Sequence, residues 1–324
     1  MKAIVQDVYG GADVLRLRDV AKPVPGDDEV LVRVRAAAVD AGVWILMTGR
    51  PYVVRPFFGL RKPKVPVRGR DLAGVVEAVG SKVTRFAPGD EVYGTSKGGS
   101  FAEYATTPER FLARKPAGLS FEQAAAVPVS GVTALQGVRD LAGVEKGQRV
   151  MIIGASGGVG SYAVQIAKAL GAHVTGVCGP AKADAVRSLG ADDVIDYTRE
   201  EIDRDGPVYD VIIDIAGDRP LSLIRRALTK RGTLVLAGGG YNKAPVLGGF
   251  GRSLRAPVVS WFVPQTLRML GAKEGFAPLD DLTGLIDSGA VTPLIDRVYP
   301  LSDAPAALHR FTAGHATGKI VISV

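Results

Sequence analysis

One segment constrains the fold of this chain more than any other: an apolar run, Val150–Ile153, leads directly into the glycine-rich residues 154–160. The apolar run predicts a buried strand, and the residues after the glycines have the spacing of an amphipathic helix. A spaced-glycine pattern is weak by itself, and Ala155 stands at its first glycine position, but this strand and this helix are the context that the pattern requires. In that context Gly157 lets backbone N–H groups approach a pyrophosphate, and Gly160 lets the helix pack closely on the strand. The segment predicts a dinucleotide-binding turn, and an ordinary glycine-rich turn is the alternative. The residues of the predicted turn are Ala155, Ser156, Gly157, Gly158, Val159 and Gly160.

The end of the next predicted strand, His173–Val177, indicates which dinucleotide is bound. An NAD site places Asp or Glu roughly 20 residues after the glycines, where the carboxylate binds the ribose hydroxyls. Here the strand is followed by Cys178 and Gly179, no carboxylate occurs before Asp184, and Lys182 is placed to meet a 2′-phosphate. We therefore predict NADPH as the cofactor. The alternative for Lys182 is a solvated lysine at the start of a helix.

From about residue 121 the chain alternates between strand and helix patterns, which builds a parallel sheet with helices on both faces. Helices are predicted over 159–170 and near 181–189, each followed by a glycine that can cap it. We assign 121–265 to a doubly wound Rossmann domain that binds NADPH. Ala237, Gly238 and Gly239 follow a strand of this domain, at a place where a backbone can approach a nicotinamide closely. Its strands are predicted over 149–153, 173–177, 193–196, 209–215 and 233–237.

Residues 1–120 have a different pattern, in which apolar and polar residues alternate between turn signals. In Glu29–Arg35 the valines occupy one face, as in a half-buried strand. This pattern predicts an antiparallel, barrel-like or sandwich-like domain. A helix near 303–312 and a strand over 319–324 are too polar-patterned to extend the buried parallel sheet, so we expect 266–324 to complete the first domain. Two domains also suit a length of 324 residues.

The composition excludes several classes of protein. One cysteine rules out a disulfide framework, and three histidines leave few ligands for a zinc site. Residues 150–167 carry no charge and are long enough to span a membrane, but their glycines and serines suit a strand, loop and helix better. The first residues contain no apolar signal core, so we expect a cytoplasmic protein without a membrane partner.

The net charge of +7 and the pI near 9.5 raise the question of nucleic-acid binding. Much of the excess is local, because seven cations and no acidic residue lie between 50 and 70. No nucleic-acid fold motif accompanies this run. We interpret it as a solvated basic loop beside a site for an anionic cofactor, and we expect no nucleic-acid partner.

Taken together, the motifs resemble those of the medium-chain dehydrogenase/reductase superfamily, and most closely its zinc-free quinone oxidoreductase branch, which includes the zeta-crystallin-like enzymes. The resemblance extends from residue 1 to 324, with several motifs in fixed order. These motifs are Gly69–Val76, Pro88–Gly94, Gly99–Tyr104, Ala124–Pro128 with Thr133–Ala134, Gly154–Gly160, Leu189–Tyr197 and Gly314–Lys319.

The resemblance implies a GroES-like catalytic domain with an inserted Rossmann domain, a cleft between them, and commonly a homodimer. In relatives a Lys after the second strand and a Tyr after the third bind the 2′-phosphate, which here matches Lys182 and Tyr197. His315 occupies a position comparable to a basic residue near the C-terminus that often helps. Thr133 matches a residue near the nicotinamide. A tyrosine that only caps a strand end is the alternative for Tyr197.

Zinc-dependent members use an early Cys, a His-Glu pair after a glycine, and a later Cys or Asp. The corresponding positions here resemble Asp40, Arg70–Asp71 and roughly Val129. A catalytic zinc needs about three N, O or S ligands and an open position, which these residues do not supply. We therefore expect no metal.

Without a Lewis acid, an electron-poor quinone or an α,β-unsaturated carbonyl is a more accessible hydride acceptor than a simple aldehyde. Candidate catalytic residues lie on 39–52, where Asp40 departs from the Asn of related quinone reductases. Asp40 is either a buried acid with a raised pKa or a carboxylate paired with Arg70, and both alternatives stay open. Tyr52 could donate to the acceptor oxygen and Trp44 could wall the pocket, although core packing is the commoner role of such aromatics.

We therefore predict a zinc-independent, NADPH-dependent oxidoreductase that transfers a hydride to a quinone or enone, with protonation by Tyr52, Asp40 or solvent. One alternative is a carbonyl or alcohol oxidoreductase on the same scaffold, because fold does not settle chemistry. The other is a non-catalytic sensor that binds NADPH and grips RNA or another partner through residues 50–70.

Overall fold

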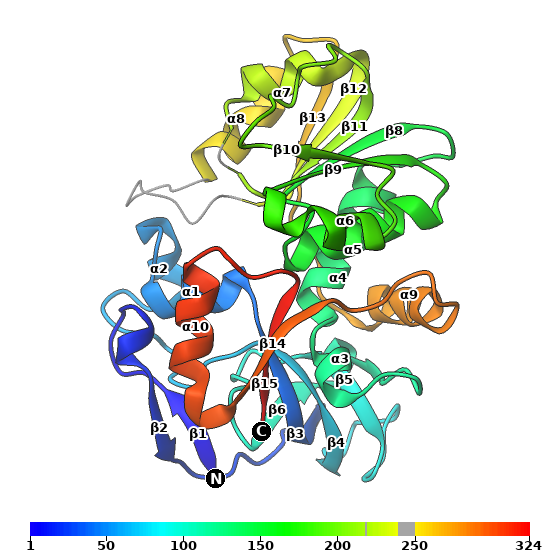
Figure 1. Cartoon of the computed structure of the whole chain (residues 1–324). Coiled ribbons are helices and arrows are strands. Elements are labelled where there is room, and N and C mark those ends of the chain that lie inside the picture. The colour runs from blue at the N-terminus through cyan, green and yellow to red at the C-terminus, as the bar shows by residue number, and fades with distance from the viewer. Residues whose placement is uncertain (218, 239–249) are drawn as a thin grey trace. The chain divides into compact units, whose positions relative to one another are not determined.

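The computed structural model describes residues 1–217, 219–238 and 250–324. The chain divides into two units (Figure 1). Unit 1 comprises Met1–Val132, Glu274–Ser288 and Pro293–Val324, and unit 2 comprises Thr133–Lys273 and Gly289–Thr292. The second unit is thus inserted in the first.

The division differs from the expected one at both ends of the insertion. Residues 121–132 belong to unit 1, because the buried alanines of α3 (Phe121–Ala125) pack on β3, β4 and β15. At the other end, β13 (Thr266–Met269) pairs in parallel with β12 and so belongs to unit 2. The boundary within α4 (Pro128–Leu135) falls between Val132 and Thr133.

Unit 1 is built on an antiparallel sheet, as the alternation in its sequence predicts. Among the described residues the sheet has seven strands in the order β14-β15-β3-β4-β5-β7, with β6 paired to β3, and only the β14–β15 pair is parallel. Along β3 the valines are buried while Arg33 and Arg35 are exposed. The last strand, β15, pairs with β3 through Ile320 and Val39, so the end of the chain returns to the first unit. The strands are β3 (Glu29–Val39), β4 (Asp71–Val79), β5 (Glu91–Thr95), β6 (Tyr104–Pro108), β7 (Leu112–Arg114), β14 (Ile295–Pro300) and β15 (Lys319–Ser323).

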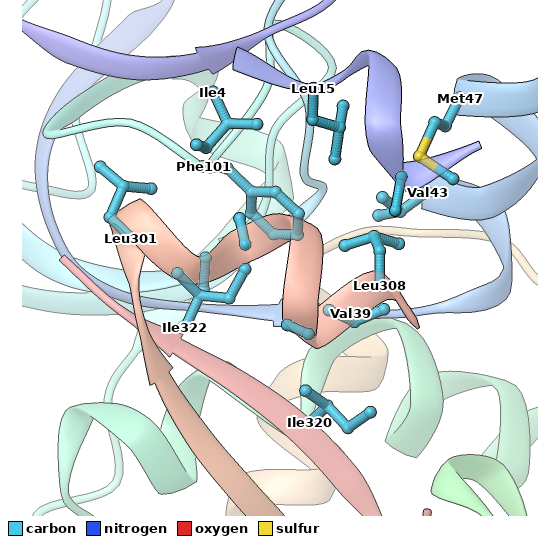
Figure 2. Close-up of a cluster of buried hydrophobic side chains, with 14 residues drawn as sticks. Ile4, Leu15, Val39, Val43, Met47, Phe101, Leu301, Leu308, Ile320 and Ile322 are labelled. Carbon is cyan, nitrogen blue, oxygen red and sulfur yellow. The ribbon is translucent and has the colours of Figure 1, made fainter. Parts of the chain in front are cut away.

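Two helices, α1 and α10, cover one face of this sheet. Figure 2 shows Ile320 and Ile322 of β15 in one buried cluster with Leu308 of α10 and Val43 and Met47 of α1. This packing fixes α1 on the sheet. The remaining elements of unit 1 are β1 (Lys2–Val5), η1 (Ala12–Val14), β2 (Arg16–Asp19), α1 (Ala41–Thr48), η2 (Tyr52–Val54), α2 (Arg55–Phe58), η3 (Glu109–Phe111), α9 (Phe276–Asp287), η6 (Leu301–Asp303) and α10 (Ala304–Thr312).

Unit 2 is the predicted doubly wound domain. Its described strands form a six-stranded parallel sheet in the order β10-β9-β8-β11-β12-β13. This order reverses between β8 and β11, which makes that edge the switch point where open parallel sheets bind ligands. The strands are β8 (Arg149–Ile153), β9 (His173–Cys178), β10 (Asp193–Asp196), β11 (Tyr209–Asp214), β12 (Leu228–Leu236) and β13 (Thr266–Met269).

The helices of unit 2 lie on both faces of its sheet, with α5 and α6 on one face and α7 and α8 on the other (Figure 1). A buried cluster that includes Met151, Ile212 and Leu234 joins the central strands to α7. The helical elements are η4 (Gln136–Leu141), α5 (Gly158–Ala169), η5 (Pro180–Lys182), α6 (Ala183–Ser188), α7 (Leu221–Ala227) and α8 (Phe250–Ser260).

Candidate active site

The glycine-rich loop of unit 2 leaves β8 at Gly154, whose φ of +87° turns the chain sharply. The backbone N–H groups of Gly154 and Ala155 both donate to the carbonyl of Val177 at 3.1 Å, so the loop is held against the end of β9. Gly157 N then donates to Gly154 O at 3.1 Å and closes the turn. The loop is therefore preformed by its own backbone.

Helix α5 begins against this loop so closely that one position tolerates no side chain. A Cβ on Gly160 would overlap the carbonyl oxygen of Gly154 and the backbone of Ala155. At the N-terminus, Gly157 is extended, no side chain caps the helix, and the first turn contains no acidic residue. The N–H groups of the first helical turn have no partner within the helix, and the helix dipole favours an anion there. These residues fit a pyrophosphate.

Other predicted residues lie at the switch point, beside the glycine-rich loop. A Cβ on Gly154 would lie 3.3 Å from Ala216 N, just after β11. Ala237 N donates to Asp214 O at 2.9 Å, and a Cβ on Gly238 would overlap the carbonyl of Ile215. At the carboxyl ends of β8, β11 and β12, residues with small or no side chains thus bring backbone close to backbone. Gly239, predicted with Ala237 and Gly238, lies outside the described residues.

The residues predicted to distinguish NADPH from NADH lie at the end of β9. Tyr197 N donates to Cys178 O at 3.3 Å, and a Cβ on Gly179 would lie 3.5 Å from the Tyr197 hydroxyl. Lys182 N donates to Gly179 O at 3.0 Å and closes the turn that follows the strand. Cys178, Gly179, Lys182 and Tyr197 therefore form one site at the surface of unit 2.

Two further cations, which the sequence reasoning missed, lie at this site. The Arg219 guanidinium is 5.8 Å from the centroid of the Tyr197 ring. Burial raises the pKa of the Cys178 thiol, and the Asp196 carboxylate raises it further, while Lys182 and Arg187 lower it. Arg187 was recognisable as a basic residue of α6, five residues after Lys182, whereas Arg219 comes from a separate loop and no sequence pattern indicated it.

Asp40 caps the N-terminus of α1 through one carboxylate oxygen, while its Oδ2 is buried with no hydrogen-bond partner among the described residues. Its Oδ1 accepts from Gly42 N at 2.5 Å and Val43 N at 3.1 Å, and the Arg70 Nη1 is 3.4 Å away. The side chain is buried. Of the two alternatives for Asp40, this arrangement favours the carboxylate paired with Arg70.

The two predicted aromatic residues have different surroundings. Trp44 on α1 is half-buried and packs against the core cluster of Figure 2, which is the common structural role. Tyr52 is exposed, and the guanidinium of Arg55 lies 4.5 Å from its ring centroid.

Arg70 also pairs with Glu274, and Thr95 Oγ1 donates to the other carboxylate oxygen of Glu274 at 2.9 Å. The sequence reasoning missed Glu274, because it lies 204 positions from Arg70 in a loop before α9. Thr95 and Glu274 line a small pocket within unit 1 together with Pro128, Val132, Gly275 and Leu279.

A second buried pair of charges lies in the same unit. Lys319 Nζ donates to Asp71 Oδ2 and to Ser130 Oγ, both at 3.0 Å, and Asp71 Oδ1 accepts from Val129 N at 2.9 Å. Burial raises the pKa of Asp71 to about 6, although the Lys319 ammonium and the Val129 N–H act against the rise. The signal for this pair was a charge at the start of each of two strands whose next residues are apolar.

Two further residues, Thr133 and His315, were predicted from the resemblance alone. Thr133 is half-buried in α4. His315 is exposed and follows Gly314 in the turn between α10 and β15. Their roles stay predictions.

The positions that would correspond to zinc ligands do not fit a zinc ion. Asp40 is bound by two amides and Arg70, and Asp71 is bound by Lys319 and Val129 N. Within residues 1–217, 219–238 and 250–324 no three His, Cys, Asp or Glu side chains form a metal-binding cluster. None of the helices in this described part is long and apolar enough to cross a membrane.

Comparison with known proteins adds to this geometry. The alcohol dehydrogenase GroES-like domain family matches residues 26–117, and the zinc-binding dehydrogenase family matches residues 189–322. A chloroplast envelope quinone oxidoreductase homolog of Arabidopsis thaliana is 33% identical over 99% of this chain and 98% of its own length. The fold is similar to an NAD-dependent alcohol dehydrogenase (TM-score 0.84, 30% identity, 100% of each chain). It is equally similar to a mycobacterial protein complexed with NADPH (TM-score 0.84, 27% identity, 100% of each chain).

Proposed function

Since the chain belongs to the medium-chain dehydrogenase/reductase superfamily, in its quinone oxidoreductase-like branch, we propose that it reduces a quinone or an α,β-unsaturated carbonyl with NADPH and without zinc. That it is an oxidoreductase follows from the named relatives, and a nicotinamide cofactor agrees with the NADPH-complexed neighbour. The choice of NADPH, the acceptor and the absence of zinc are our proposal.

The single observation that carries the cofactor choice is the chemistry at the end of β9. Lys182 and Arg187 act on the Cys178 thiol and Arg219 lies beside Tyr197, and a phosphate on the ribose 2′-oxygen is the anion that such a cationic site suits. Among the described residues two carboxylates lie close by and both are engaged: Asp196 accepts from Thr198 N and Thr198 Oγ1, and Asp184 pairs with Arg187 at 2.9 Å. A ribose without a phosphate would lack the acidic partner that NAD sites provide.

The residues of unit 2 have distinct tasks in this proposal. The first turn of α5 binds the pyrophosphate, Lys182 and Tyr197 hold the 2′-phosphate, and the backbone of Ala237 and Gly238 borders the nicotinamide. When bound, the cofactor supplies a hydride from C4 of its nicotinamide ring. The protein contributes orientation and exclusion of water, which lower the barrier mainly by holding the reactants close together.

The acceptor class follows from the donors that unit 1 offers. A simple carbonyl needs strong stabilisation of its developing oxyanion, which zinc supplies in other enzymes. Quinones and enones spread that charge over a conjugated system and need less help. Because Asp40 is held by two amides and Arg70, we assign the final protonation to Tyr52 or to solvent.

The test is oxidation of NADPH, followed by its absorbance, with a small panel of acceptors. The panel holds 1,4-benzoquinone, 9,10-phenanthrenequinone, an enone, an enal and a saturated aldehyde, with NADH as the matched control and a metal chelator added in parallel. We expect turnover of the quinones or the conjugated carbonyls with NADPH, unchanged by chelator. Loss of activity on chelation would overturn the zinc-independent mechanism.

The likeness to an NAD-dependent alcohol dehydrogenase favours one alternative, a carbonyl or alcohol oxidoreductase. Turnover restricted to the saturated aldehyde, or a preference for NADH, would support it. Tight NADPH binding without any turnover would instead indicate a sensor.

Our proposal also includes a homodimer in the cytoplasm. Light scattering on the purified protein measures the mass of the particle and so tests the dimer.

A further inference from the structure

One surface of unit 1 has no task in the proposed reaction. It consists of three apolar side chains, Phe57, Phe58 and Leu60, and four cations. We call it the basic–apolar patch; its cations are Arg50, Arg61, Lys62 and Lys64.

The patch is held in shape by contacts to the rest of unit 1. Arg55 Nε donates to Gly49 O at 3.0 Å, which ties α2 to the end of α1. Lys64 N donates to Phe58 O at 2.9 Å, and Tyr9 Oη donates to Gly59 O at 2.6 Å. Gly59 has a φ of +123°, which a glycine adopts most easily, so the chain closes into a turn between Phe58 and Lys64.

The apolar side chains of the patch extend into solvent. Phe57 is 73% exposed and Leu60 is 70% exposed, and Phe58 beside them is also exposed. A cluster of large apolar side chains rimmed by polar residues is typical of a binding surface, because its contact with water is unfavourable. Neither Phe nor Leu carries a polar atom in its side chain, so these residues suit a hydrocarbon environment.

The charge around these side chains has one sign. Arg50, Arg61, Lys62 and Lys64 are exposed, and no acidic residue occurs between 50 and 70. Within the described part of the chain none of the four forms an ion pair. Their positive charge is therefore available to an anionic surface.

We propose that the basic–apolar patch docks this protein on a membrane surface rich in anionic lipid. The cations face the lipid phosphates while Phe57 and Leu60 enter the boundary between headgroups and acyl chains. Nucleic acid would also attract the cations, and its bases can stack on Phe57 and Phe58, but the aliphatic Leu60 offers no ring for stacking and suits acyl chains better. The proposal departs from the expectation of no membrane partner. Docking of this kind needs no segment that spans the membrane, so it is compatible with described helices that are too short to do so.

The experiment is co-sedimentation of the full-length protein with vesicles. Vesicles of phosphatidylcholine with about one third phosphatidylglycerol are compared with vesicles of phosphatidylcholine alone. We expect binding to the anionic vesicles at low salt, little binding to the neutral ones, and release at about 0.5 M salt, where charges are screened within a few ångström. Equal binding to both kinds of vesicle, or binding to neither, would overturn the proposal.

Two double variants test the two parts of the patch. Removing two cations in R61Q/K62Q should weaken binding on the order of 25-fold, at about five-fold for each cation. Its control, K230Q/R231Q, removes two adjacent exposed cations from unit 2 and should leave binding unchanged. The variant F57S/L60S removes two apolar side chains. It should weaken binding at least tenfold, which is roughly the effect of no longer burying one large apolar side chain. Its control, V8S/V24S, changes side chains that are 56% and 86% exposed elsewhere in unit 1.

Two other occupants of the patch are distinguishable in the same series. If R61Q/K62Q abolishes binding to a single-stranded RNA oligonucleotide but not to vesicles, the partner is nucleic acid and the proposal is wrong. If F57S/L60S raises the KM for the quinone and leaves vesicle binding intact, the patch belongs to the substrate entrance and the proposal is also wrong. Acceptor turnover in free solution should be unchanged in both variants, so failure of the proposed reaction does not affect this test.

Discussion

Lys319 and Asp71 form an ion pair in the interior of unit 1, with Nζ 3.0 Å from Oδ2 and with 2% and 0% of the side chains exposed. The two residues are 248 positions apart and begin β15 and β4. Asp71 also accepts from Val129 N, and Lys319 donates to Ser130 Oγ, so the same pair holds the first turn of α4. Three elements distant in sequence are thereby joined at one buried point.

The Lys319→Met variant should lose about 3–5 kcal/mol of the free energy of unfolding, because it leaves Asp71 buried without its counter-charge. Urea denaturation at pH 8 measures this loss. The double variant D71L/K319M removes both charges and should recover most of it. A single variant as stable as the parent chain would show that the pair contributes nothing.

The deficit of Lys319→Met should also depend on pH. Burial already raises the pKa of Asp71 to about 6 with Lys319 present, and removing the ammonium raises it further. A carboxyl group with a raised pKa in the folded state contributes most stability when it is protonated, and that contribution declines as pH rises toward the folded pKa. We therefore expect a smaller deficit at pH 5 than at pH 8, and urea denaturation at both pH values measures it. A deficit that grows on acidification would contradict the assignment.

Gly160→Ala and Gly157→Ala should separate packing from phosphate binding. A Cβ at 160 overlaps Gly154 O, so this variant should lose about 1–3 kcal/mol of stability as well as NADPH affinity. A Cβ at 157 lies 3.4 Å from Gly154 O, which is room enough, so stability should change little while NADPH affinity falls. Thermal unfolding and fluorescence titration with NADPH provide the two readouts. Unchanged affinity in both variants would remove the loop from the cofactor site.

Lys182→Ala should weaken NADPH binding by about 1 kcal/mol, or roughly five-fold, and leave NADH binding nearly unchanged, because only NADPH carries the 2′-phosphate. Titration with each dinucleotide measures the two affinities. Lys146→Ala, an exposed lysine elsewhere in unit 2, serves as the control. Equal losses for both dinucleotides would assign Lys182 another role.

Asp40→Asn and Asp40→Ala should differ, because Asn also caps helices well and Ala does not. The Ala variant should lose about 1–2 kcal/mol of stability because the first amides of α1 lose their acceptor, whereas the Asn variant should keep most of it. If Asp40 is structural, the Asn variant also keeps its turnover of the acceptor panel. A large fall in kcat with intact stability would instead restore Asp40 as the proton donor.

Much of unit 2 was predictable because its signals are local. The strand 149–153 and the strand 193–196 have the predicted bounds, and α5 differs from its prediction by one residue at each end. In β8 the signal is a run of four consecutive apolar residues, which is typical of a strand buried on both faces. The glycine loop was equally local, since the requirement for glycine at 160 comes from the backbone six residues earlier.

Unit 1 was less predictable, because its chemistry depends on residues brought together from far along the chain. The sequence by itself determined five strands of unit 2, the glycine turns and the fold class, since these depend on periodicity and on backbone conformation. Only the tertiary structure decided that α3 packs in unit 1, that β13 extends the parallel sheet, and that Asp40 caps a helix beside Arg70. It also decided the partners of Arg70 and Asp71, because Glu274 and Lys319 reach them from the other end of the chain, and no local pattern encodes which buried charges meet.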